Sequence, residues 1–227
     1  MSQIILSEQA SAPSTPSSGK VATYVDTTGV PLLKLVDDAG GVTTELDDKL
    51  IRRAFSTGTV NTGFEADKYL VGSGITIPSG RPPVAGATYH CRFDMVKTAA
   101  CTSAIVITVR FGLLGTTADA AILQFTLGVG TAAIDTGMFE IWAHFRTVGA
   151  TTTAVLVGVC SVNHALAATG LTTTGTGGFG GFPLVSSGFD STVANSILGV
   201  SFNGGTTGAN FVGTNTLVEA EWRNLSV

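Results

Sequence analysis

Apolar residues recur at every second position along much of the chain beyond residue 54, and this pattern constrains the fold more than any other feature. Between residues 89 and 95, for example, the residues between the apolar ones are His90, Arg92 and Asp94. A β-strand places successive side chains on opposite faces, so such a segment predicts a strand with one buried face. The same alternation recurs in residues 105–111, 121–127, 139–145, 155–159 and 217–222.

Turns rich in Gly, Thr and Asn separate these segments, and no stretch shows the 3.6-residue period of an amphipathic helix. The absence of a short internal repeat disfavours a solenoid or a fibre-shaft β-helix. We therefore predict an all-β protein in which residues 54–227 form an antiparallel, jelly-roll-like β-sandwich. Residues 168–182, a Gly/Thr-rich segment, are expected to lie over the end of the sandwich or across a neighbour.

The first 53 residues have a different composition. Residues 1–19 are mostly Ser, Pro and Ala and have too little apolar surface to build a core, so we predict an extended N-terminal arm. Residues 20–53 contain three short β-prone runs divided by Asp, Gly and Pro, which is typical of a small β-meander. In residues 47–53 acidic residues precede basic ones, which predicts a short helical or turn-like linker.

Charge and hydropathy exclude several classes of partner. Charged residues make up 12% of the 227 residues, against about 25% in an ordinary soluble domain, and the net charge is -4. An isoelectric point near 5.2 disfavours a nucleic-acid partner. No apolar run reaches the roughly 18 residues of a spanning helix, and the first residues lack the basic region of a signal peptide. We expect no membrane partner and assembly in a reducing cytoplasm.

Ionised side chains are scarcest in the middle of the chain. Between Thr98 and Val218 they are only Arg110, Asp119, Asp135, Glu140, Arg146 and Asp190. A monomer that exposed this stretch would have little of the charge that normally keeps proteins apart in solution. We therefore expect an oligomer, and a homotrimer of sandwiches fits this expectation, although the charge pattern does not fix the symmetry.

No catalytic or metal-binding motif accompanies the histidines and cysteines. His90 and His144 alternate with apolar neighbours and are expected to face solvent or an interface. The adjacent His90 and Cys91 must point to opposite faces of a strand, so they cannot bind one metal ion together. Three cysteines with no CxxC pair encode no disulfide framework and are interpreted as small buried hydrophobic residues.

The acidic residues do not define a catalytic pair either. Glu219 and Glu221 share a strand face about 7 Å apart, but this spacing also describes an ordinary solvated strand. The sequence lacks GxSxG, a phosphate-binding GxxxxGK[ST] loop and a calcium-binding DxDxDG loop. We therefore expect no enzyme activity, no cofactor and no metal ion.

The N-terminal residues IILSEQASAPSTPSSGKVATYVDTTGVPLLKLVDDAGGVTTEL resemble a module of virion proteins of tailed bacteriophages. In that module a Pro/Ser-rich arm ending in SSGK leads into VAxYVDTxG and a KxDDAG-like turn. The later segments DKYLVGSGITIPSG, ATYHCRFDMVKTAACTSAIVITVRFG, TTADAAILQFT and TAAIDTGMFEIWAHFRTVG look like the β-sandwich attached to such arms. The resemblance implies a trimeric structural protein without catalytic residues. VPLLKLVDDAG departs from it, because a more polar strand is expected before the turn.

The leading functional hypothesis is a capsid-decorating or cement protein on the virion surface. Its arm and meander would bind the major capsid protein, and the sandwich would trimerise and face outward. The chain has neither heptads nor repeats for a fibre shaft, so it should sit close to its attachment surface. The residues expected at this interface are Ile4, Ile5, Leu6, Pro13 and Pro16 in the arm and Tyr24, Leu32, Leu33 and Leu35 in the meander.

The alternative is a tail-fibre or receptor-binding protein that binds carbohydrate. Such a site needs an exposed aromatic residue, and the alternation places Trp142 on the strand face opposite Ile141 and Phe145. Trp142 is therefore the candidate carbohydrate contact. A depolymerising hydrolase is a third hypothesis, which lacks a catalytic constellation.

Overall fold

The computed structural model describes residues 8–9, 11, 14–18, 22–26, 32–36, 42–44, 50–77, 82–166, 169–173 and 182–224. All regular secondary structure in these ranges is β-strand, which confirms the predicted all-β fold. The chain forms two compact units, residues 1–50 with 224–227 and residues 51–223. Within the described ranges, no helix has the length and apolar character needed to cross a bilayer.

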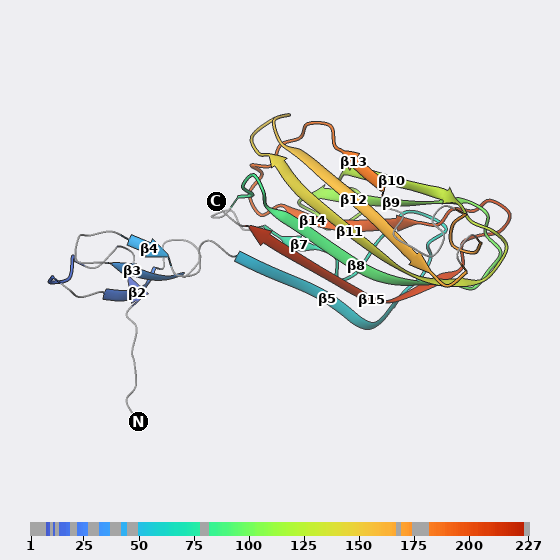
Figure 1. Ribbon diagram of the computed structural model, residues 1–227, viewed down its shortest axis with the longest axis horizontal. Coiled ribbons are helices and arrows are strands. Elements are labelled where there is room, and N and C mark those ends of the chain that lie inside the picture. The colour runs from blue at the N-terminus through green and yellow to red at the C-terminus, as the bar shows by residue number, and fades with distance from the viewer. Residues whose placement is uncertain are drawn as a thin grey trace, which may run out of the picture. The chain divides into compact units, whose positions relative to one another are not determined.

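The first unit contains a four-stranded sheet in the order β1-β2-β3-β4 (Figure 1). Three of its strands run antiparallel as the predicted meander, and β1 pairs in parallel with β2. Tyr24 and Val36 are buried in it. The strands are β1 (Glu8–Gln9), β2 (Ala22–Asp26), β3 (Leu32–Val36) and β4 (Val42–Thr44).

The residues expected at a capsid interface are only partly described. Tyr24 lies in β2 and is buried, and Pro16 is half-buried. Three others, Leu32, Leu33 and Leu35, lie in β3, which pairs along its whole length with β2. The arm residues outside the described ranges are Ile4, Ile5, Leu6 and Pro13.

The second unit is a β-sandwich made of two sheets that lie face to face (Figure 1). One sheet has the order β13-β12-β11-β8-β15-β5, and the other has the order β10-β9-β14-β6 with β7 also paired to β14. The sandwich is confirmed, and its jelly-roll type stays a prediction. The strands are β5 (Leu50–Asn61), β6 (Lys68–Tyr69), β7 (Ile75–Thr76), β8 (Thr88–Lys97), β9 (Ala104–Gly112), β10 (Ala120–Val129), β11 (Asp135–Thr147), β12 (Val155–His164), β13 (Phe182–Val185), β14 (Ile197–Asn203) and β15 (Gly213–Asn224).

The predicted helical or turn-like linker is wrong for residues 50–53. These residues are the first four of β5, which pairs with β15 at the edge of the six-stranded sheet. The order of charges in residues 47–53 complements a helix dipole by only a few tenths of a kcal/mol up to about 1 kcal/mol. The continuous ladder of backbone hydrogen bonds in a long strand outweighs that preference. Residues 47–49 lie outside the described ranges.

Aromatic side chains join the two sheets of the sandwich. Phe93 of β8 stacks on Phe139 of β11, with ring centroids 5.1 Å apart. Phe202 of β14, in the other sheet, meets them edge to face at 6.1 and 5.7 Å respectively. All three side chains are fully buried, and each such burial stabilises the fold by about 2 kcal/mol. The predicted alternation is thus the pattern of one core between two sheets.

Three of the six ionised residues in the weakly charged middle of the chain are buried, namely Arg110, Asp119 and Asp135. Arg110 donates from Nε to Ser201 Oγ at 2.8 Å and from Nη1 to the Asp119 carbonyl at 2.7 Å, and it also pairs with Asp67. Burying a charge without partners would be costly, and these contacts satisfy it. The surface of this stretch therefore carries even less charge than its sequence indicates.

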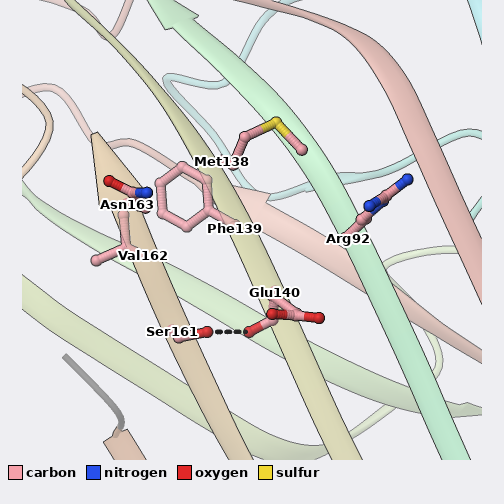
Figure 2. Close-up of a pocket in the computed structure, with 7 residues that line it drawn as sticks. All are labelled: Arg92, Met138, Phe139, Glu140, Ser161, Val162 and Asn163. Carbon is pink, nitrogen blue, oxygen red and sulfur yellow. Dashed lines mark hydrogen bonds between the residues drawn. The ribbon is translucent and has the colours of Figure 1, made fainter. Parts of the chain in front are cut away.

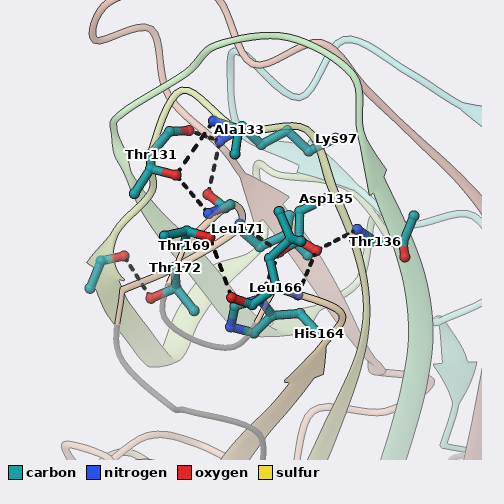
Figure 3. A network of polar contacts seen from close by, with 12 residues as sticks. Lys97, Thr131, Ala133, Asp135, Thr136, His164, Leu166, Thr169, Leu171 and Thr172 are labelled. Carbon is teal, nitrogen blue, oxygen red and sulfur yellow. Dashed lines mark hydrogen bonds and ion pairs between the residues drawn. The ribbon is translucent and has the colours of Figure 1, made fainter.

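A buried polar network ties together three loops at one end of the sandwich (Figure 3). Its cation is Lys97, the last residue of β8, whose side chain is 1% exposed. Its ammonium group donates to the carbonyls of Cys101 and Gly170 at 2.8 and 2.9 Å, and to the carbonyl of Thr131. Burial lowers the pKa of Lys97, and nearby Asp135 partly offsets this effect. The three carbonyls satisfy all three donors of the ammonium group.

The anion of the same network is Asp135, the first residue of β11 (Figure 3). Its Oδ2 lies 2.6 Å from Nδ1 of His164 and accepts the Leu171 N–H at 3.0 Å. Its Oδ1 accepts the N–H groups of Thr136 at 2.9 Å and Leu166 at 3.2 Å. Leu171 is buried, so residues 169–173 of the Gly/Thr-rich segment pack over this end of the sandwich.

We predict that Lys97→Met lowers the free energy of unfolding by about 3 kcal/mol, because it removes a buried donor from the carbonyls of Cys101, Thr131 and Gly170, of which Gly170 keeps the Thr131 N–H. Urea denaturation measures this change. Lys68→Met is the matched control, since Lys68 is exposed on β6, and surface substitutions usually change stability by less than about 0.5 kcal/mol. Equal stabilities of the two variants would contradict the structural role of the network.

The cysteines provide a second test of the core. All three are free and buried, which confirms their interpretation as small hydrophobic residues. Burial raises the pKa of Cys91 and of Cys160 to about 12, so at pH 8 their thiolate fraction falls by roughly three orders of magnitude from that of a free thiol. We predict that iodoacetamide labels neither residue in the native chain and labels both in guanidinium chloride, as measured by peptide mass spectrometry. Rapid labelling of the native chain would show that the core is open.

Candidate functional site

The outer face of the six-stranded sheet, defined as the side of β8, β11, β12, β13 and β15 that points away from the core, carries a patch of aromatic and ionisable side chains. These side chains lie there because the alternate positions of the same strands fill the core. Strand register aligns them in two neighbouring rows across the sheet. The rows are Glu221–His90–Trp142–Val159 and Glu219–Arg92–Glu140–Ser161.

One face of the Trp142 indole is covered by a histidine. His90 stacks on it with ring centroids 3.9 Å apart and planes inclined by 17°. Register places His90 of β8 on one side of Trp142 and Val159 of β12 on the other. The second face of the indole is therefore turned toward β12 and its residue Val159. His144 continues the row of rings along β11, within 11° of parallel and 6.5 Å away, a separation close to the two-residue advance of about 7 Å along a strand.

Aliphatic side chains lie on the β12 side of Trp142. Val157 and Val159 of β12 are half-buried, and they pair across the sheet with Val185 and Pro183 of β13. Pro183 is exposed, and 59% of Val185 is accessible. The part of β12 and β13 beside Trp142 is therefore apolar, and Trp142 stands at its border.

The outer face is charged on the β8 side of Trp142. His90 Nε2 lies 2.8 Å from Glu140 Oε1, and Arg92 Nη2 lies 2.8 Å from Glu219 Oε2. The side chains of Arg92 and Glu219 are 50% and 42% exposed, so their ion pair contributes only about 0–1 kcal/mol. Such a pair can rearrange around a ligand at little cost. A further pair joins Arg223 to Glu221.

A pocket of about 240 Å³ opens next to this border. Figure 2 shows its polar groups on both sides of β11, with Arg92 coming from β8 and Ser161 and Asn163 from β12. Met138 and Glu140 of β11 lie between them, and Ser161 Oγ donates to the Glu140 carbonyl at 3.4 Å. Donors, acceptors and a thioether thus line one shallow depression, which suits a polar ligand with apolar C–H surfaces.

The geometry offers binding groups rather than a catalytic pair. Glu219 and Glu221 do share the outer face of β15, as predicted, but each is matched with an arginine and not with a second carboxyl across a cleft, as glycoside hydrolysis requires. Within the part of the chain that the structure describes, no three His, Cys, Asp or Glu side chains converge as metal ligands.

The structure places Trp142 where the alternation predicted it, opposite the buried Ile141 and Phe145. His90 and His144 lie on the same outer face, also as predicted. Sequence reasoning missed that His90 stacks on Trp142 and that Arg92, Glu140 and Ser161 share a row beside them. Only the pairing of β8 with β11 and of β11 with β12 brings these residues together.

The sequence matches no protein-family model and no curated protein. Among solved structures, the fold is similar to the CBM2 module of the evolved Dit of Lactobacillus casei BL23 phage J-1, with 11% identity over 68% of this chain and 70% of that chain and a TM-score of 0.27. It is also similar to structures of infectious bursal disease virus. The Gx strain gives 10% identity over 89% of this chain and 48% of that chain with a TM-score of 0.22, and the Gt strain gives 12% over 91% and 50% with 0.25. At these TM-scores the similarities assign neither a family nor a function.

Proposed function

We propose that the chain is a non-catalytic structural protein of a tailed-phage particle and that its sandwich binds carbohydrate on the host surface. The virion assignment is supported by the resemblance of the N-terminal residues to modules of phage virion proteins. The carbohydrate assignment is supported by one observation above all, the outward-facing and half-buried Trp142 next to Glu140 of a pocket that is also lined by Arg92 and Asn163. We therefore favour the receptor-binding hypothesis over capsid decoration.

The chemistry of sugars fits this arrangement. A pyranose presents C–H groups on its faces and hydroxyl groups around its rim, so it needs an aromatic surface for the first and donors and acceptors for the second. Trp142 supplies the surface, while Glu140 and Ser161 supply groups for the rim. The exposed ion pair of Arg92 with Glu219 has low stability, so Arg92 can change partners when a sugar replaces water.

A homotrimer would strengthen such binding. With Arg110, Asp119 and Asp135 buried, the surface between residues 98 and 218 has little charge to prevent association. Three sites on one trimer would multiply a weak affinity for each sugar by avidity. The trimer is part of the proposal, together with a location on the outside of the particle.

We predict that Trp142→Ala weakens binding to host cells, and to their isolated surface polysaccharide, by about thirtyfold, corresponding to the roughly 2 kcal/mol of a buried aromatic contact. Sedimentation of labelled protein with cells measures this loss. Stability should fall by only about 1 kcal/mol, because the lost intramolecular contact is the stack on His90.

Val71→Ala serves as the control, because Val71 is 51% exposed and follows β6 of the other sheet. It removes a comparable exposed apolar surface away from the outer face and should bind like the unchanged chain. Undiminished binding by the Trp142 variant would place the receptor site elsewhere.

Capsid decoration is the second candidate, favoured by the separate first unit with its small four-stranded sheet. So small a sheet gains stability from a partner surface, and the major capsid protein is the proposed one. Assembly would take place in the host cytoplasm.

This candidate predicts that a chain beginning at Lys20 still forms trimers but binds particles at least tenfold less tightly than the full-length chain. Re-addition of each protein to particles stripped of it, followed by gel quantification, measures the difference. If both chains bind equally, the N-terminal arm is not the attachment segment.

A further inference from the structure

We infer that the outer face binds an uncharged oligosaccharide of at least two sugar units, with one unit in the pocket at Met138–Glu140 and the next against the side of Trp142 that is turned toward β12. This inference rests on the proposed function and specifies the class of its ligand. It follows from the spacing of the two subsites, the charges around them and the direction of the apolar surface.

The spacing sets the minimum length. Met138, Glu140 and Trp142 occupy successive outward positions of β11, so the far end of the pocket and the indole are separated by about 14 Å along the strand. A single pyranose ring is shorter than this span, so it cannot stack on the indole and also reach the far end of the pocket at Met138. A ligand that uses both must run along β11.

Both subsites face β12. The second face of Trp142 is turned toward β12, and so is the side of the pocket formed by Ser161 and Asn163. Val159, beside Trp142, is small and half-buried. A chain of sugars can therefore stack on the indole and continue over β12 into the pocket without crossing the histidine stack.

The charges on the outer face disfavour an acidic ligand. With Asp94, the carboxylates Glu140, Glu219 and Glu221 outnumber the three guanidinium groups of this face, Arg92, Arg146 and Arg223, so the patch is formally negative when its histidines are neutral. Arg92 and Arg223 already have carboxylate partners, and Arg146 lies beyond Trp142 on the side away from the pocket. An acidic sugar would have to displace one of these partners and enter a field of its own sign.

A fourth carboxylate, that of Asp94 on β8, lies at the pocket end of the face. It accepts the N–H groups of Thr216 at 2.9 Å and Leu217 at 2.7 Å from the neighbouring strand β15. Its hydrogen bonds keep it in place and add to the negative potential. Sugar hydroxyl groups, which donate to carboxylates and accept from arginine, meet no such penalty.

The test uses the full-length chain and an array of defined neutral and uronic-acid oligosaccharides of one to six units, followed by titration calorimetry with the best ligands. We expect neutral oligosaccharides to bind at least tenfold more tightly than acidic ones of equal length. Affinity should rise at least tenfold from one unit to the length that fills both subsites. Asn163→Ala and Trp142→Ala should each abolish most of this gain with length, whereas Val71→Ala should preserve it.

The outcomes separate the two levels of the proposal. Tighter binding of acidic sugars, or equal binding of one unit and of longer chains, would overturn the inference. If that binding still depended on Trp142, the carbohydrate function would stand. If no sugar on the array binds, or if Trp142→Ala leaves the affinity for sugars unchanged, both the carbohydrate function and the inference are wrong.

Discussion

The contact of Phe202 with the stacked pair Phe93 and Phe139 is the interaction on which the rest of the structure depends, because it decides which side of β8 and β11 faces inward. Strand side chains have a period of two, so a shift of one residue would exchange the two faces completely. With Phe93 and Phe139 committed to the core, His90 and Trp142 must stand outside and side by side. The candidate site is thus a geometric consequence of the same register that builds the core.

The sequence alone predicts the strands whose two faces meet different surroundings. The alternation did not predict β14, because nearly all of its residues are buried. Leu198, Val200 and Phe202 face the core, while on its other side Ser201 is covered by Arg110 and Gly199 approaches Tyr69 so closely that a Cβ could not be added. A strand that is buried on both faces shows no alternation of apolar and polar residues, and its few polar residues resemble those of a turn. The start of β5 was mispredicted for a different reason, because the order of its charged residues is typical of a short helix.

The site could be predicted one residue at a time but not as a group. Alternation is local, and it identifies Trp142 as an outward side chain without information from any other strand. The group that surrounds Trp142 comes from residues about 50 positions earlier on β8 and about 80 positions later on β15. Such pairings depend on topology, which the pattern within each strand does not contain. The same holds for Lys97, whose three carbonyl partners belong to separate loops.

The stack of His90 on Trp142 also has a spectroscopic consequence. The chain has two tryptophans, and Trp222 is fully buried, so the emission of Trp222 should be insensitive to events on the outer face. Trp142 is half-buried with an imidazole against one side of its ring, and a stacked imidazole quenches indole emission more strongly when it is protonated. A ligand bound on the other side of the indole would exclude water from the ring and alter that quenching. The chain thereby carries an intrinsic optical reporter located at the surface whose contacts are in question.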